Sequence, residues 1–105
     1  MEDIALPETL LKSIINLIIN YKAVDKIAIF GSRARNDNKP HSDIDIVIWD
    51  KDLSHTDINI IKNKLEEEIH TVLKFDVLNF YKIEKKSLAE NILEDGVMIY
   101  ESRNN

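Results

Sequence analysis

The sequence predicts a single α/β domain, of the α+β type, in which helices flank a mixed or antiparallel sheet. Apolar residues recur at helical spacing in residues 7–21 and again in residues 58–69. Residues 24–30 and 43–49 have instead the β-branched or alternating composition of strands. Only a dozen residues separate these two strands, which suits a short helical turn and disfavours a doubly wound parallel sheet.

Three further elements are predicted in the second half of the chain. Residues 72–80 form an apolar run typical of a strand. Ser87 and Glu90 have capping-box spacing and predict the start of a short helix, which Gly96 would close. A last strand is expected at residues 97–100, so the predicted order is helix, strand, strand, helix, strand, helix, strand.

Length and composition favour one ordinary globular domain spanning residues 1–105. Hydrophobic residues make up 44% of the chain and charged residues 31%, which is a balance unlike that of disordered proteins. The absence of cysteine excludes disulfides and thiolate zinc sites and favours a cytoplasmic location. Glu2 and Asp3 stand where a signal peptide needs basic residues, and no apolar run approaches the roughly 20 residues of a membrane span.

The overall charge disfavours bulk nucleic-acid binding. Fourteen Lys and Arg against nineteen Asp and Glu give a formal net charge of −5, which repels a phosphate backbone. A local basic cluster is still expected around Arg33, Arg35 and Lys39.

Three aspartates stand where strands should be apolar. Asp43 and Asp45 lie two apart in one strand, so their carboxylates share a face. Asp76 lies within the apolar run 73–78, where we expect it to be buried and where an unpaired carboxylate would be costly. If these strands are neighbours, three like charges converge, and a divalent cation would relieve their repulsion. Oxygen ligands without histidine or cysteine favour magnesium or manganese over zinc.

The pair Gly31-Ser32 follows a predicted strand and precedes the predicted helical turn. Glycine lets the backbone approach a phosphate closely, and the serine hydroxyl adds a hydrogen-bond donor. A phosphate site and a metal site in one short stretch together indicate a metal-bound nucleoside triphosphate.

These residues resemble the signature of a known superfamily. Gly31-Ser32, ten residues and then Asp43-Ile44-Asp45 are similar to the G-S-x10-D-x-D motif of the polymerase-β-like nucleotidyltransferases, and Asp76 matches their third carboxylate. The fuller run from Gly31 to Arg35 and from Ser42 to Asp45 resembles the minimal nucleotidyltransferases of prokaryotes, called MNT proteins. The resemblance covers nearly the whole chain.

The resemblance implies a role for each matching residue. Asp43 and Asp45 would bind two Mg²⁺ ions, or Mn²⁺, and Asp76 would join one of them and help deprotonate the attacking hydroxyl. Gly31 and Ser32 would hold the β- and γ-phosphates of ATP, and Arg35 would contact phosphate or a partner. The reaction would be attack on the α-phosphate with departure of pyrophosphate.

The resemblance also implies a partner, and it leaves alternatives open. MNT proteins are typically antitoxins of HEPN/MNT pairs, in which a tyrosine of the HEPN ribonuclease becomes adenylylated. Larger relatives carry an additional helical domain, so a homo- or hetero-oligomer would complete the site. Two alternatives are transfer to a small molecule and neutralisation of the toxin by binding alone.

Other interpretations of the motifs are weaker. A lone D-x-D is common, and an edge strand exposing two carboxylates would explain it, but not Asp76 or Gly31-Ser32. The stretch after Asp43 lacks the ligands and glycine of a calcium loop. Arg35 and His41 have the spacing of a HEPN motif, but Pro40 denies them a helix. His55 and His70 have no ligand spacing and are expected at helix ends or on the surface.

Overall fold

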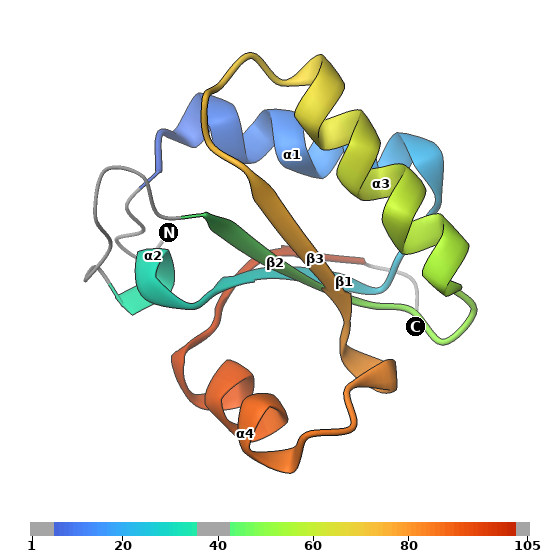
Figure 1. Ribbon diagram of the computed structural model, residues 1–105, viewed down its shortest axis with the longest axis vertical. Coiled ribbons are helices and arrows are strands. Elements are labelled where there is room, and N and C mark those ends of the chain that lie inside the picture. Colours follow the sequence, from blue (N-terminus) through green and yellow to red (C-terminus); the bar gives the residue numbers. More distant parts are fainter. Residues whose placement is uncertain (1–5, 36–42, 103–105) are drawn as a thin grey trace.

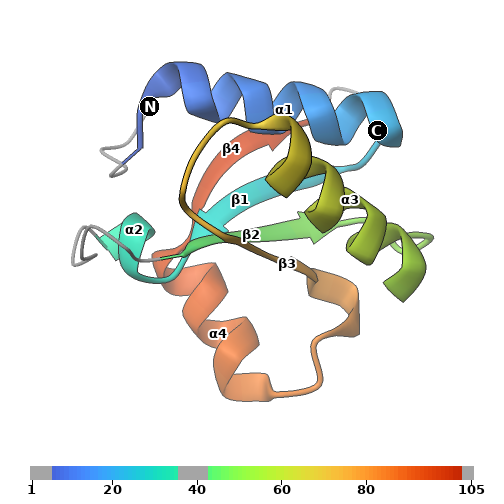
Figure 2. The ribbon, with the colours of Figure 1, turned by 45° about the horizontal axis from the view of Figure 1, so that its top comes forward.

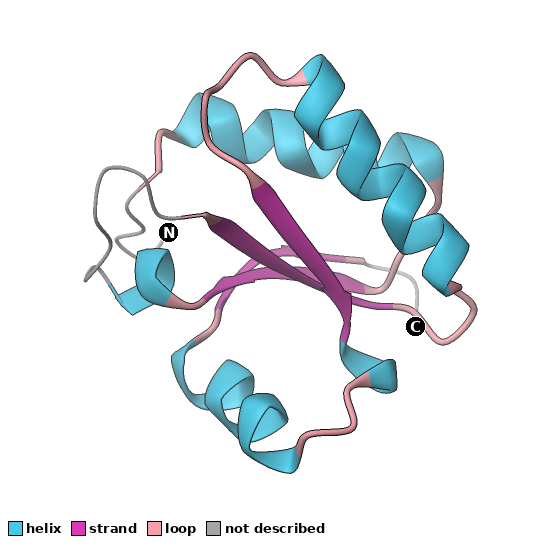
Figure 3. Ribbon diagram, viewed as in Figure 1, coloured by secondary structure: helices cyan, strands magenta, loops and turns pink. Residues whose placement is uncertain are grey.

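A four-stranded sheet lies between two helical layers in the computed structural model, which describes residues 6–35 and 43–102. Helices α1 and α3 cover one face of the sheet, and α4 covers the other (Figures 1 and 2). The elements, in chain order (Figure 3), are α1 (Glu8–Tyr21), β1 (Lys26–Phe30), α2 (Ser32–Arg35), β2 (Ile44–Trp49), α3 (His55–Glu68), β3 (Phe75–Asn79), the 3-10 turn η1 (Phe80–Lys82), α4 (Lys86–Asp95) and β4 (Val97–Glu101).

The sheet is mixed, which confirms the predicted fold class. Its strand order is β3-β2-β1-β4, with β1 antiparallel to both β2 and β4 and with β2 parallel to β3. The short α2 turn between β1 and β2 permits their antiparallel pairing, whereas α3 carries the chain back so that β3 can run parallel to β2.

The two central strands are apolar on both faces because helices cover both. On the α1 and α3 side, five isoleucines of β1 and β2 are fully buried: Ile27, Ile29, Ile44, Ile46 and Ile48. On the α4 side a smaller cluster contains Ala28, Phe30, Val47, Trp49 and Ile92. Burial on both faces explains the nearly continuous hydrophobic run of β2. No helix in the described part of the chain is long and apolar enough to cross a membrane.

Two local predictions are wrong. The strand expected at residues 72–80 is shorter, because Val72 is 92% exposed before β3 begins and η1 follows directly after Asn79. Ser87 does not cap α4, since the helix begins at Lys86, one residue earlier, with Lys85 at the cap position and no side-chain cap bond. Gly96 does end α4, where an added Cβ would overlap the carbonyl oxygen of Ile92.

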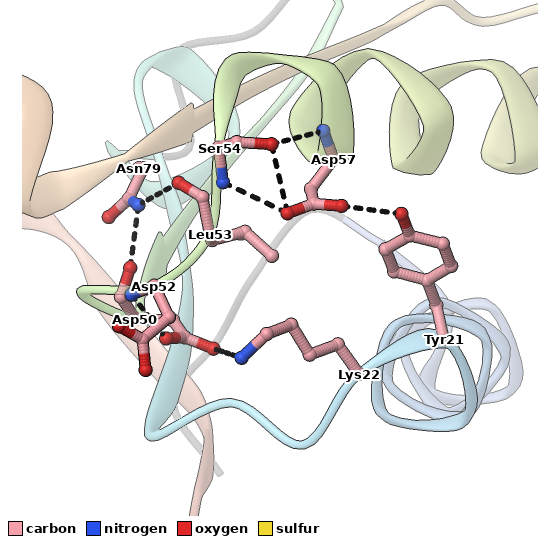
Figure 4. A network of polar contacts seen from close by, with 8 residues as sticks. All are labelled: Tyr21, Lys22, Asp50, Asp52, Leu53, Ser54, Asp57 and Asn79. Carbon is pink, nitrogen blue, oxygen red and sulfur yellow. Dashed lines mark hydrogen bonds and ion pairs between the residues drawn. The ribbon is translucent and has the colours of Figure 1, made fainter.

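The capping box lies instead at the start of α3. The Ser54 hydroxyl accepts from the Asp57 amide at 3.1 Å, and the Asp57 carboxylate accepts from the Ser54 amide at 3.0 Å. The same carboxylate accepts a hydrogen bond from the Tyr21 hydroxyl at 2.6 Å, which joins α3 to the end of α1 (Figure 4). Both contacts fix the first turn of α3.

A buried asparagine ties the end of β3 to the connection between β2 and α3. The Asn79 amide donates to the carbonyls of Asp50 at 2.7 Å and Leu53 at 2.9 Å (Figure 4). The Asn79 side-chain oxygen accepts from the Tyr81 amide at 3.2 Å. Lys22 adds an ion pair to the Asp50 carboxylate at 2.7 Å. One side chain therefore satisfies three backbone groups where two connections meet.

We predict that Asn79→Ala lowers the free energy of unfolding by about 1–3 kcal/mol, because two buried carbonyls lose their donor. Urea denaturation measures the change. The exposed Asn63 on α3 provides the control, since Asn63→Ala should change stability by no more than about 0.5 kcal/mol. Equal effects of the two substitutions would contradict the structural role of Asn79.

Candidate functional site

The predicted acidic residues meet at one end of the sheet. Asp43 comes directly before β2, Asp45 is the second residue of β2, and Asp76 is the second residue of β3. Asp45 and Asp76 are register partners in the parallel pair, so their side chains project from the same face. That face is the α4 side, because Ile44 and Ile46 point into the opposite layer under α1 and α3.

The acids are less buried than the sequence suggested. Asp43 and Asp76 are exposed, and Asp45 is half-buried. The expected burial of Asp76 is therefore wrong. Its neighbours Phe75 and Val77 are buried in the main core, and the alternation of a strand turns Asp76 to the other face. There α4 does not cover it, so its carboxylate remains accessible to a ligand.

The pKa of the Asp45 carboxylate is raised from its ordinary value. Partial burial is the main cause that raises its pKa to about 6, the negative charges of Asp76 and Asp43 contribute to the same rise, and Arg35 opposes it. Asp76 and Asp43 therefore each lie near enough to Asp45 to repel its carboxylate. Within residues 6–35 and 43–102, no three acidic, histidine or cysteine side chains stand close enough to hold a metal ion as they are.

The chemistry of these donors nevertheless fits a hard divalent cation. All three are carboxylates, and the raised pKa of Asp45 reflects its partial burial first and then the negative charges of Asp76 and Asp43. A divalent ion placed among them would remove that repulsion, and magnesium takes only one or two carboxylates when phosphates and waters complete its shell. A complete protein cage is therefore not required.

Gly31 lies directly against Asp45. Its φ of 75° is in the left-handed region, and an added Cβ would overlap the carboxylate oxygen Oδ2 of Asp45. The Gly31 carbonyl accepts hydrogen bonds from the amides of Ala34 at 3.1 Å and Arg35 at 3.2 Å, which closes α2. Glycine is thus required both by the turn and by the neighbouring carboxylate.

The other residues predicted for the site differ in how exposed they are. Ser32 is half-buried at the start of α2, and Arg35 is exposed near enough to lower the pKa of Asp45. Arg33 is only 6% exposed, so it does not join Arg35 in an open basic cluster. Lys39 lies outside the described residues, as do Glu2 and Asp3 at the N-terminus, and Pro40, His41 and Ser42.

The two histidines considered from sequence lie away from the acids. His55 is exposed at the start of α3, and His70 is exposed just after that helix ends. Both positions match the surface or helix-end locations that the sequence predicted. The direct contact between Gly31 and Asp45 was not foreseen, although a glycine between a strand and a helical turn was a signal of close approach.

Comparisons with known proteins show the family and the fold of the chain. The profile of the family described as "Polymerase beta, Nucleotidyltransferase" matches residues 12–105. No curated protein matches the chain by sequence.

Solved structures share the fold at low identity. A toxin–antitoxin structure with AMP-PNP is 20% identical, with a TM-score of 0.77 over 89% of this chain and 74% of the other. The MntA-HepT toxin–antitoxin structure is 18% identical, with a TM-score of 0.72 over 91% and 74%. A structure from Shewanella oneidensis is 13% identical, with a TM-score of 0.73 over 92% and 74%.

We predict that Gly31→Ala lowers the free energy of unfolding by about 1–2 kcal/mol through its left-handed backbone. It should also displace the Asp45 carboxylate. The penalty should therefore shrink in an Asp45→Ala background, with a coupling of at least about 0.5 kcal/mol in a double-mutant cycle. The same penalty in both backgrounds would show that the two residues do not interact.

The raised pKa of Asp45 predicts a pH-dependent effect of Asp45→Asn. The folded protein holds the Asp45 proton up to a pKa of about 6, above the unfolded value of about 3.9, so this contribution to stability is lost as pH rises through about 6. Asp45→Asn should therefore gain stability relative to wild type between pH 5 and 7.5, by about 1 kcal/mol after allowance for solvent screening.

Urea denaturation at both pH values measures this difference. Asp25→Asn, an exposed position just before β1, is the matched control and should give the same difference from wild type at both pH values. A relative stability of Asp45→Asn that stays constant or falls with pH would refute the electrostatic crowding of this site.

Proposed function

This chain belongs to the polymerase beta nucleotidyltransferase family, and from that premise we propose that its sheet end is the active site of an ATP-dependent protein adenylyltransferase. The observation that carries the proposal is the register of Asp45 with Asp76, with Gly31 against the Asp45 carboxylate. Asp43, at the entrance to β2, would complete the catalytic carboxylates. A carboxylate pair beside a glycine turn suits a metal-bound triphosphate.

Members of this family generally use divalent metal ions, and the carboxylates here suit Mg²⁺ or Mn²⁺. We propose that Asp43 and Asp45 bind two ions and that Asp76 binds one of them. When bound, the metals neutralise the phosphate charge and the crowded carboxylates. Gly31 would let the β- and γ-phosphates approach the backbone, the Ser32 hydroxyl would donate to them, and the exposed Arg35 would contact phosphate or partner.

The proposed step is an in-line displacement at the α-phosphorus of ATP. The acceptor hydroxyl oxygen forms a bond to the α-phosphorus, while the bond to the oxygen bridging the α- and β-phosphates breaks. Pyrophosphate leaves, and the hydroxyl proton passes to Asp76 and then to water. Because the family chemistry depends on positioning and charge neutralisation, the protein needs no covalent intermediate.

The exposure of Asp76 supports a macromolecular acceptor. Its side chain is exposed to solvent, so a hydroxyl carried by another protein can reach it. The likeness to toxin–antitoxin structures, one with AMP-PNP, supports a HEPN ribonuclease toxin as that protein and a tyrosine as the acceptor. The chain would then act in the cytoplasm as the antitoxin and form a hetero-oligomer with its target.

Two other functions, transfer to a small molecule and neutralisation of the toxin by binding alone, can be distinguished from protein adenylylation. Transfer to a small molecule would need an enclosed acceptor cavity beside Asp76, which the exposure of this residue does not favour. Neutralisation by binding alone is compatible with exposed carboxylates. Asp76, which the sequence predicted to be buried, is exposed, so its burial gives no argument against masking of the toxin by binding alone.

We predict that the protein transfers labelled AMP from ATP to a cognate HEPN protein in the presence of Mg²⁺. Asp43→Asn, Asp45→Asn and Asp76→Asn should each reduce kcat/KM at least about a hundredfold, because each removes a charge that positions metal or proton. Asp25→Asn, at the other end of the sheet, should retain wild-type activity. Absence of transfer by the wild-type protein would refute the proposed function.

Toxin neutralisation in cells separates modification from masking. Variants Asp43→Asn and Asp45→Asn should fail to protect cells from the toxin while still binding it. Full protection by these variants would assign neutralisation to binding alone.

A further inference from the structure

The outer edge of β3 offers backbone hydrogen-bonding groups beside the proposed active site. Strand β3 is at the end of the described sheet and pairs with β2 alone (Figure 1). The Ile44 amide donates to the Lys74 carbonyl at 2.9 Å, whereas the Phe75 amide points outward and donates to the Glu66 carboxylate at 3.3 Å. The Phe75 amide is therefore occupied, and the groups offered to an added strand begin after it. Because alternate residues of a strand share a direction, Val77 also turns its amide and carbonyl away from β2.

An apolar groove follows this edge. Its volume is about 210 Å³, and it is bounded by Val77 and Leu78 of β3, Ile58 of α3, and Ile83 and Leu88 at the approach to α4. Pockets for drug-sized ligands measure roughly 300–1,000 Å³. The groove is therefore suited to one or two side chains of a longer chain rather than to a nucleotide.

The rim of the groove is basic on an acidic protein. Lys82, Lys85 and Glu84 line it, and residues 82–86 contain three lysines against this one glutamate. The chain as a whole has a net charge of −5. This local reversal of sign complements an acidic segment and disfavours a second copy of the same acidic chain.

The spacing along β3 connects the groove to the catalytic end. Leu78, which lines the groove, and Asp76 are two residues apart and lie on the same face of the sheet. A strand paired alongside β3 would carry alternate side chains on that face at intervals of roughly 6.6–7 Å. One of them can enter the groove beside Leu78 while the next lies beside Asp76.

We propose that the edge of β3 binds an extended acidic segment of the acceptor protein as an added strand, with an apolar side chain in the groove two residues from the acceptor hydroxyl. This inference rests on the proposed function and adds the acceptor's conformation and local sequence to it. Asn79 and Ser54, through the hydrogen bonds described above, hold the groove's walls in place (Figure 4). Such preorganisation reduces the entropy lost on binding.

The probe is a fluorescein-labelled nine-residue peptide with a central tyrosine, valine two positions to either side and glutamate elsewhere. Its binding is measured by fluorescence anisotropy without nucleotide. Two further versions of the peptide carry N-methyl groups on two backbone amides each. In one version these amides belong to residues i and i+2, and in the other to residues i+1 and i+3, so that each version blocks a different edge of the strand. Strand addition predicts that one version loses at least about tenfold in affinity and the other stays within about threefold.

Charge reversal tests the rim. Lys82→Glu with Lys85→Glu should weaken peptide binding at least about tenfold. Lys12→Glu with Lys64→Glu makes the same change in net charge on α1 and α3, away from the groove, and should change binding by no more than about twofold. Because neither pair belongs to the proposed catalytic group, binding of an ATP analogue with Mg²⁺ should remain unchanged.

Several outcomes would overturn the inference. These are no binding of the parent peptide, equal responses to both methylation patterns, equal effects of the two lysine pairs, and self-association of the protein abolished by Lys82→Glu with Lys85→Glu. Failure of the proposed function looks different. In that case the parent peptide binds and only one of its two methylated versions loses affinity, but mass spectrometry detects no AMP on the peptide or on the HEPN protein.

Discussion

The crowding of carboxylates at the end of β2 is the constraint on which the site depends. Asp45 is held between Asp76, its register partner, and Gly31, whose missing side chain leaves room for the carboxylate. Burial and like charge together raise its pKa to about 6. A protein that keeps such a group stores an unfavourable interaction, which a bound cation can convert into binding free energy.

The topology produces this crowding from segments far apart in sequence. The short α2 turn brings β2 back antiparallel to β1, so the Gly31 turn and the start of β2 lie at one end of the sheet. Helix α3 then returns the chain so that β3 begins at that same end. The mixed sheet therefore gathers the Gly31 turn and the carboxylates, while Asn79 and the α3 cap fix the opposite end.

Much of this arrangement was predictable because short-range patterns determine it. The alternation of Asp43 and Asp45 with isoleucines fixed their common face, and the glycine after an apolar strand marked the turn. The exposure of Asp76 was not predictable, since it depends on how much of the sheet α4 covers. Ser87 had capping-box spacing, yet α4 begins one residue earlier at Lys86, and the true box at Ser54 uses aspartate in place of glutamate.

The surface proposed to bind the acceptor protein lies on β3, the strand that also carries Asp76. The strand that carries Asp76 also presents an unpaired edge, an apolar groove and a basic rim within a few residues. The proposed catalytic group and the proposed docking surface thus share one strand, so a bound segment would be aligned with the Asp76 carboxylate by backbone geometry. This coupling requires no lid or additional domain from this chain.

A crystal structure of the protein with Mn²⁺ and a non-hydrolysable ATP analogue tests the central claim most directly. Anomalous scattering should place manganese about 2.1 Å from carboxylate oxygens of Asp45, with Asp43 or Asp76 as a further ligand and the triphosphate against the Gly31 turn. Manganese and triphosphate bound elsewhere, with Asp45 uncoordinated, would contradict the account.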